Sequence, residues 1–123
     1  MARLAEVGEV IHIGRKRVFD LSNARRTLAV VRRITERSIK EVEAVRRRHS
    51  GVRVRQSIDA FETELNTVLD DWSHKVEQLG CQPKGLWLVD FDNGEGYYCW
   101  RYPERDISHC HGYDDGYASR ERF

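Results

Sequence analysis

The sequence predicts an α+β fold in which a long antiparallel helical hairpin is followed by a three-stranded antiparallel β-meander. Apolar residues recur every three or four positions through two long segments that lack internal proline and glycine. The period then changes to that of short strands separated by turns. We expect one domain over residues 1–123, with the hairpin at 20–80, the meander at 85–113 and a tail at 114–123.

The first predicted helix runs from about Ser22 to His49. Asp20 or Ser22 can accept the free amide hydrogens of a helix start, and Gly51 is typical of a helix end. The second helix runs from near Ser57 to Gly80, and the short loop between the two makes them antiparallel neighbours. The apolar stripe of the second helix consists of Ile58, Phe61, Leu65, Val68, Trp72, Val76 and Leu79.

Three strands are predicted after the hairpin. They are Leu86–Phe91, Tyr97–Tyr102 and Ile107–His111, with turn residues at 92–96 and 103–106. Residues 1–16 form an N-terminal extension, in which Val10–Ile13 has the composition of a short strand. The apolar stripes of the helices are long relative to this small sheet, so we expect a homodimer formed through the hairpin.

The predicted register decides which side chains share a face of the sheet. If Tyr102 pairs with Ile107, Cys99 lies opposite Cys110 and Tyr98 lies opposite His111. Since side chains alternate along a strand, both histidines of His109-Cys110-His111 then lie on the face opposite to the cysteines. A zinc site that mixes these histidines and thiols is therefore disfavoured.

An oxygen-rich metal site is the alternative that the residues allow. Glu104, His111 and Asp114 are the candidate ligands for a divalent metal, and no other cofactor is predicted. A catalytic interpretation would use His111 as a general base, oriented by Asp114 or Asp115, with Arg101 stabilising an anion. The simpler interpretation is that Cys99 is a small buried residue and that His111 and Asp114 hydrogen-bond within the fold. No glycine-rich phosphate loop or nucleophile elbow is present, so the sequence favours a non-enzymatic protein.

The charges are distributed unevenly between the two halves of the chain. Residues 1–55 hold 15 Lys and Arg against 6 Asp and Glu, and residues 56–123 hold 6 against 14. A basic first helix beside an acidic second helix neutralises itself, and this interpretation is favoured over nucleic-acid binding because the basic residues lack stacking aromatics. No secretory signal or membrane-spanning run is predicted, and three cysteines are typical of a reducing cytoplasm rather than a disulfide framework.

The C-terminal third resembles a bacterial family known as domain of unknown function 2203. The resemblance rests on Cys99-Trp100-Arg101 followed by Glu104, His111, Asp114, Gly116 and Arg120 at matching spacing. Val18-Phe19-Asp20-Leu21 is similar to the start of that family's first helix, and most of residues 17–120 is covered. Cys110 and Trp87 depart from the pattern, standing where the family tends to have tryptophan and glycine. The resemblance supports the fold boundaries and singles out Arg101, Glu104, His111 and Asp114, but it implies no reaction.

Two functional hypotheses follow from the sequence. The leading one is a non-enzymatic interaction or scaffold protein that self-associates through its hairpin. The alternative is a protein, either a binding protein or an enzyme, that binds a divalent metal or a small ligand through Arg101, Glu104, His111 and Asp114.

Overall fold

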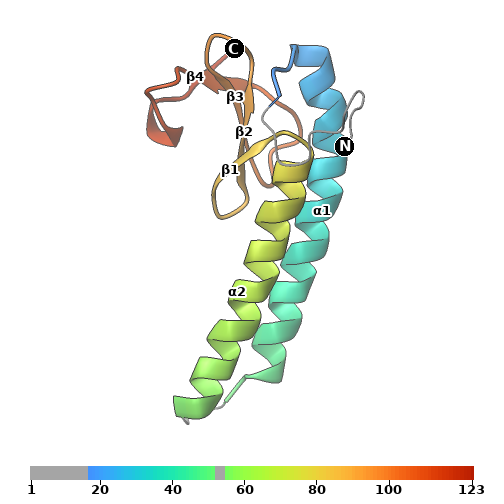
Figure 1. Ribbon diagram of the computed structural model, residues 1–123, viewed down its shortest axis with the longest axis vertical. Coiled ribbons are helices and arrows are strands. Elements are labelled where there is room, and N and C mark those ends of the chain that lie inside the picture. Colours follow the sequence, from blue (N-terminus) through green and yellow to red (C-terminus); the bar gives the residue numbers. More distant parts are fainter. Residues whose placement is uncertain (1–16, 52–54) are drawn as a thin grey trace, which may run out of the picture.

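The computed structural model describes residues 17–51 and 55–123. The run Val10–Ile13, predicted as a short strand, lies outside the described residues. Two long helices, α1 (Leu21–Arg48) and α2 (Arg55–Gln78), lie antiparallel and side by side, which confirms the predicted hairpin (Figure 1). The Asp20 side chain accepts a hydrogen bond of 2.7 Å from the backbone N–H of Asn23 and so caps α1 as predicted.

The sheet has five strands rather than the three predicted. Its order is β1-β2-β3-β4-β5, every pair is antiparallel, and the α+β class is confirmed. The bounds are β1 Gln82–Gly85, β2 Leu88–Asp92, β3 Tyr97–Arg101, β4 His109–His111 and β5 Glu121–Arg122, with a short 3-10 helix, η1, at Tyr117–Ser119. The two unpredicted strands are the outer ones. They are short and polar, and β1 contains a proline, so neither has the apolar alternation that indicates a strand.

The inner face of the sheet packs on the hairpin and forms the core. Val89 and Trp100 are cross-strand partners, and both are fully buried together with Phe91. They pack against residues of both helices and the segment before α1, namely Phe19, Ala24, Leu28, Val31, Trp72 and Val76. Inside this core the indole N–H of Trp72 donates to the Thr35 hydroxyl at 2.9 Å, so this buried polar pair between the helices is satisfied.

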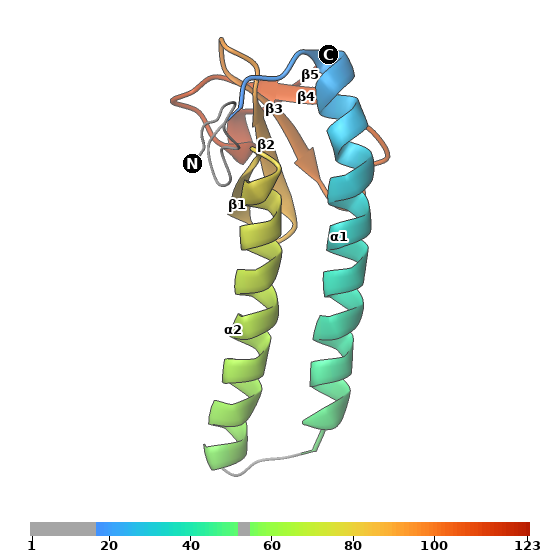
Figure 2. The same ribbon diagram turned by 45° about the vertical axis from the view of Figure 1, so that its right-hand side comes forward.

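The sheet covers one end of the hairpin and leaves the other end uncovered. Figure 2 shows the strands beside the start of α1 and the end of α2, while the half that leads to the α1–α2 connection extends away from them. No helix in the described ranges is long and apolar enough to cross a membrane.

The register between β3 and β4 differs by one residue from the predicted one. Cys99 pairs with His109, Tyr98 with Cys110 and Tyr97 with His111. The connection is not a tight turn, because residues 102–108 wrap around the end of Trp100, whose indole N–H donates to the backbone oxygen of Glu104 at 2.8 Å. A shift of one residue transfers every side chain of β4 to the other face. His109 and His111 therefore share a face with Cys99.

Candidate functional site

Three ionisable side chains meet on the outer face of the sheet, the face opposite to the helices. We call Asp90, Cys99 and His111 the outer-face triad. Each residue offers one potential ligand atom, and these three atoms all lie within 4.8 Å of one another. All three residues are buried, with 2%, 0% and 8% of their surface exposed. A carboxyl, a thiol and an imidazole thus share a site that is largely closed to solvent.

The strand register explains why these residues meet. Asp90 on β2 and Cys99 on β3 are direct cross-strand partners, so their side chains point to the same side. His111 lies on β4 opposite Tyr97, which is two residues from Cys99 and on the same face. The β3–β4 pair is close here, because a Cβ on Gly96 would lie 2.5 Å from the backbone oxygen of His111. Only glycine fits at that position.

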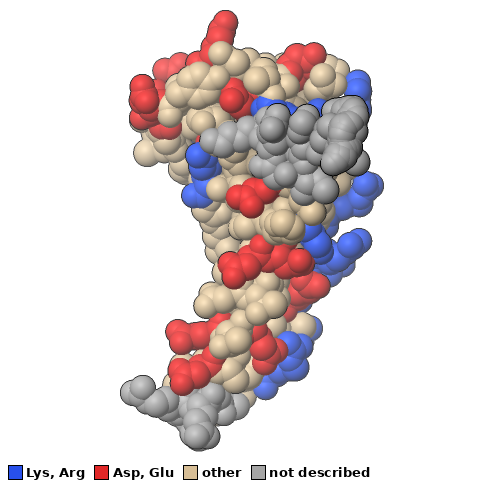
Figure 3. All heavy atoms as spheres, viewed as in Figure 1, with Lys and Arg blue, Asp and Glu red and all other residues tan. Residues whose placement is uncertain are grey.

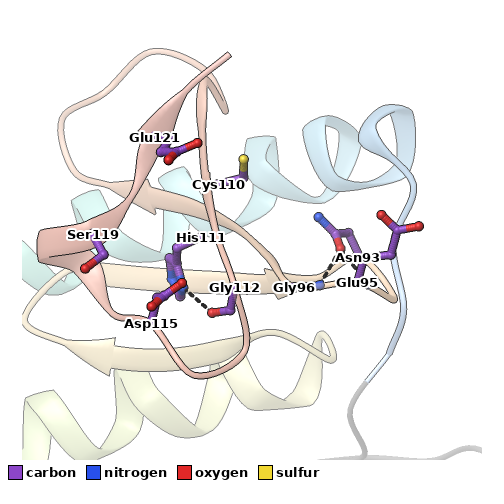
Figure 4. A pocket seen from close by; sticks show the side chains of 9 residues that line it. All are labelled: Asn93, Glu95, Gly96, Cys110, His111, Gly112, Asp115, Ser119 and Glu121. Atoms are coloured by element: carbon purple, nitrogen blue, oxygen red, sulfur yellow. Dashed lines mark hydrogen bonds between the residues drawn. The ribbon is translucent and has the colours of Figure 1, made fainter.

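Hydrogen bonds fix the orientation of the imidazole ring. His111 Nδ1 lies 2.9 Å from the carbonyl oxygen of Gly112 (Figure 4), and since a carbonyl only accepts, Nδ1 carries a proton. Nε2 lies 3.1 Å from Oδ1 of the Asp90 carboxylate, which also only accepts. A metal ion at Nε2 would take the place of this contact, while Nδ1 would keep the bond to a backbone oxygen that metal-binding histidines make with their second nitrogen.

The thiol of Cys99 is kept in its neutral form. Burial raises its pKa to about 12, and the charge of Asp90 together with a hydrogen bond to that carboxylate acts in the same direction. The nearby Arg120 guanidinium opposes these effects only in part. An isolated Cys99 is therefore not a nucleophile at neutral pH, because the thiolate is the reactive form.

A second polar cluster, which we call the Glu104 cluster, lies next to the triad. Glu104 accepts hydrogen bonds from the Arg120 guanidinium and, at 2.8 Å, from the backbone N–H of Arg101. His109 Nδ1 is 3.9 Å from the same carboxylate. Burial works against ionisation of Glu104, but the bonds from Arg120 and Arg101 hold its pKa below the usual value. This cluster ties the β3–β4 connection to the C-terminal segment.

The four residues singled out from the sequence occupy different settings. His111 belongs to the outer-face triad, and Glu104 is bonded to Arg120. The Arg101 side chain is exposed and lies over the ring of Tyr117, 5.6 Å from its centroid. Asp114 is exposed in the segment after β4. Asp90 is a site residue that was not predicted from the sequence, although a carboxylate between Val89 and Phe91 in a buried strand is itself a signal of a functional or paired acid.

An open pocket adjoins the triad on the side of His111. Its volume is about 300 Å³, and Figure 4 shows His111 and Asp115 at its wall together with the turn that contains Asn93 and Gly96. Cys110, whose side chain leaves β4 on the side opposite to His111, borders the same pocket. The pocket borders the site without opening it to solvent, because the side chain of His111 is only 2% exposed.

Fold and site together define an α+β protein with a helical hairpin and a mixed oxygen, nitrogen and sulfur cluster on an antiparallel sheet. A family model described as an uncharacterized conserved protein, DUF2203, matches residues 17–123, and the chain belongs to that family. The resemblance found in the C-terminal third is thereby confirmed. No curated protein and no solved structure matches the chain.

Proposed function

We propose that the protein binds one divalent transition-metal ion of the zinc class through the outer-face triad. The observation that carries this proposal is the convergence of three buried donor atoms of different kinds within 4.8 Å. Zinc takes thiolate, imidazole and carboxylate ligands, and a site with three protein ligands leaves a fourth position open. The thiol argues against magnesium and calcium, which prefer oxygen ligands only.

The proposal also accounts for the burial of the triad. A buried carboxylate and imidazole are costly unless they are paired or bind a metal. The His111–Asp90 pair and the contact of Cys99 with Asp90 meet this need without an ion, and a bound cation would take the place of the thiol proton in the same network. The oxygen-rich set expected from the sequence is replaced in this proposal, because Glu104 is committed to Arg120 and only His111 is retained.

Metal stoichiometry tests this function directly. We expect the purified chain, dialysed against zinc and then against buffer, to retain one zinc per chain, and Cys99→Ala to lose it. Cys110→Ala is the matched control, because it removes a less buried thiol from the opposite face. Both variants should keep the circular dichroism of the wild type. Wild-type protein without bound zinc, or equal retention by both variants, contradicts the proposal.

Self-association through the hairpin is the second candidate function. The supporting observation is that the part of α2 that precedes Trp72 has apolar side chains that are only partly covered. Phe61, Leu65, Val68 and Leu69 are half-buried, whereas Trp72 and Val76, near the sheet, are fully buried. Exposed apolar surface of this kind is typical of an interaction site.

The charges of the helices favour a second copy of this chain as the partner. α1 carries nine Lys and Arg against three Asp and Glu, and α2 carries six Asp and Glu against two Lys and Arg. Figure 3 shows acidic side chains gathered along α2 and basic ones along the edge formed by α1. In a two-fold dimer, α1 of each copy can lie against α2 of the other, so that opposite charges meet twice.

Light scattering coupled to size-exclusion chromatography tests the dimer. We expect twice the chain mass at micromolar concentrations, and the monomer mass for Val68→Asp. Val18→Asp is the matched control, since Val18 is exposed but lies before α1 at the sheet end. A monomer at all concentrations, or equal effects of the two substitutions, contradicts self-association.

A further inference from the structure

One buried amide on the outer face of the sheet lacks a hydrogen-bond partner. In residues 17–51 and 55–123, the only buried side-chain nitrogen or oxygen without a partner is Nε2 of Gln82. Gln82 is the first residue of β1 and has 7% of its surface exposed. Native structures leave few such groups unsatisfied, and each one suggests a strained site, a water or a bound ligand.

The position of Gln82 connects this amide with the outer-face triad. Gln82 pairs with Asp90, and Asp90 pairs in turn with Cys99. Cross-strand partners project to the same side of a sheet, so the three side chains form a row across β1, β2 and β3. Gln82, which carries the unpartnered amide nitrogen, is therefore the direct neighbour of a proposed metal ligand on the same face, and both residues are buried.

We propose that Gln82 is a positioning residue that holds a water or hydroxide ligand at the fourth position of the metal. This inference rests on the metal-binding function proposed above. Three protein ligands leave a tetrahedral ion one open position, which water takes in catalytic zinc sites. The amide N–H of Gln82 donates a hydrogen bond to the oxygen of that ligand.

The hydrogen bond has a chemical consequence for the bound water. Hydroxide is a stronger acceptor than water, so a fixed N–H donor favours the deprotonated form. The site would then present a metal-bound hydroxide rather than a fourth protein ligand. A coordination position held by water or hydroxide distinguishes a metal site that can act on a substrate from a structural site with four protein ligands.

The visible absorption spectrum of the full-length protein loaded with Co²⁺ tests the role of Gln82. We expect the wild-type spectrum to change with pH as the bound water ionises, and the midpoint to rise by about one pH unit in Gln82→Leu, a tenfold loss of preference for hydroxide. Co²⁺ affinity should change less than the midpoint, because no ligand to the metal is removed. Gln78→Leu, an exposed glutamine at the end of α2, is the matched control and should behave as the wild type.

Three results would overturn the inference while leaving metal binding intact. They are a wild-type spectrum that does not depend on pH, an unchanged midpoint in Gln82→Leu, and a loss of Co²⁺ binding in that variant, which would make Gln82 a direct ligand. Failure of the wild type to bind Co²⁺ would overturn the metal site itself and the inference with it. Gln82→Met provides a second variant without an N–H donor in case the leucine variant does not fold.

Discussion

At the residue scale, the outer-face triad is defined by what surrounds each side chain rather than by a motif. Asp90 and Cys99 are nine positions apart and His111 is twelve further on, and no compact spacing pattern connects them. They meet because they lie on three adjacent strands with their side chains on one face. The chemistry of the site, a neutral thiol beside an Asp–His pair, also comes from burial and not from residue type alone.

The protonation of Cys99 predicts how metal affinity depends on pH. Because the pKa of this thiol is raised to about 12, the thiol is protonated throughout the neutral range and must lose its proton when a metal binds. The apparent affinity for zinc should therefore rise by at least about tenfold for each pH unit between roughly pH 6 and pH 8. Competition with a chromophoric chelator at several pH values measures this slope, and an affinity independent of pH would rule out Cys99 as a ligand.

The Glu104 cluster predicts a loss of stability in acid. The pKa of Glu104 is lowered in the folded protein, so its ion pair with Arg120 contributes fully above the ordinary value of 4.5. The contribution is lost as the pH falls through the lowered folded value. Glu104→Gln should reduce the free energy of unfolding by about 1–3 kcal/mol at neutral pH and have little effect in strong acid.

Urea unfolding at a series of pH values measures this difference. Glu95→Gln is the matched control, since Glu95 is exposed in the β2–β3 turn and should change stability little at any pH. A deficit of Glu104→Gln that stays constant from neutral pH into strong acid would exclude the ion pair as its cause.

At the scale of elements, the helices could be predicted from the sequence much better than the sheet. The 3.6-residue period is repeated many times within each helix, and the caps are local, so both helix bounds were predicted to within about two residues. The outer strands have no comparable signal. β1 and β5 exist because their backbones pair with β2 and β4, and that pairing is decided by the packed fold.

The β3–β4 connection shows why the site itself could not be predicted. A four-residue turn at 103–106 was the natural interpretation of Pro103 and the polar residues after it. In the structure the connection is longer, because the Glu104 carboxylate accepts from the backbone N–H of Arg101 and the Glu104 carbonyl accepts from the indole N–H of Trp100. One residue of register separates a sheet with its histidines and thiols on opposite faces from one in which Cys99 and His111 meet.

The contact between the two helices gives a prediction at this scale. Trp72 on α2 donates to the hydroxyl of Thr35 on α1, and both residues are buried. Thr35→Val keeps the side-chain shape but leaves the indole N–H without a partner, so it should destabilise the protein by about 1–3 kcal/mol. Thr67→Val is the control, because Thr67 is exposed on α2 and bonds only to the backbone of its own helix. Equal unfolding midpoints for the two variants in urea would contradict this role of the hydroxyl.

At the scale of the whole molecule, the triad and the hairpin lie on opposite sides of one sheet. The inner face supplies Val89, Phe91 and Trp100 to the core, while the outer face holds Asp90, Cys99 and His111 on three different strands. A metal ion at the triad would connect β2, β3 and β4 at one point. Because β2 and β3 also carry the core residues that pack on both helices, such an ion should stabilise the entire domain.

Thermal unfolding measures this coupling between the site and the fold. A ligand that binds only the folded state stabilises it by about 2.7 kcal/mol when its free concentration is 100 times the dissociation constant. For a domain of this size, zinc should then raise the melting temperature by on the order of 10 °C, and a chelator should reverse the rise. Magnesium should have no comparable effect, because the thiolate is a poor ligand for it.

Cys99→Ala should abolish the rise in melting temperature with zinc, and Cys110→Ala should retain it. An equal rise in both variants would show that zinc stabilises the protein from somewhere other than the triad.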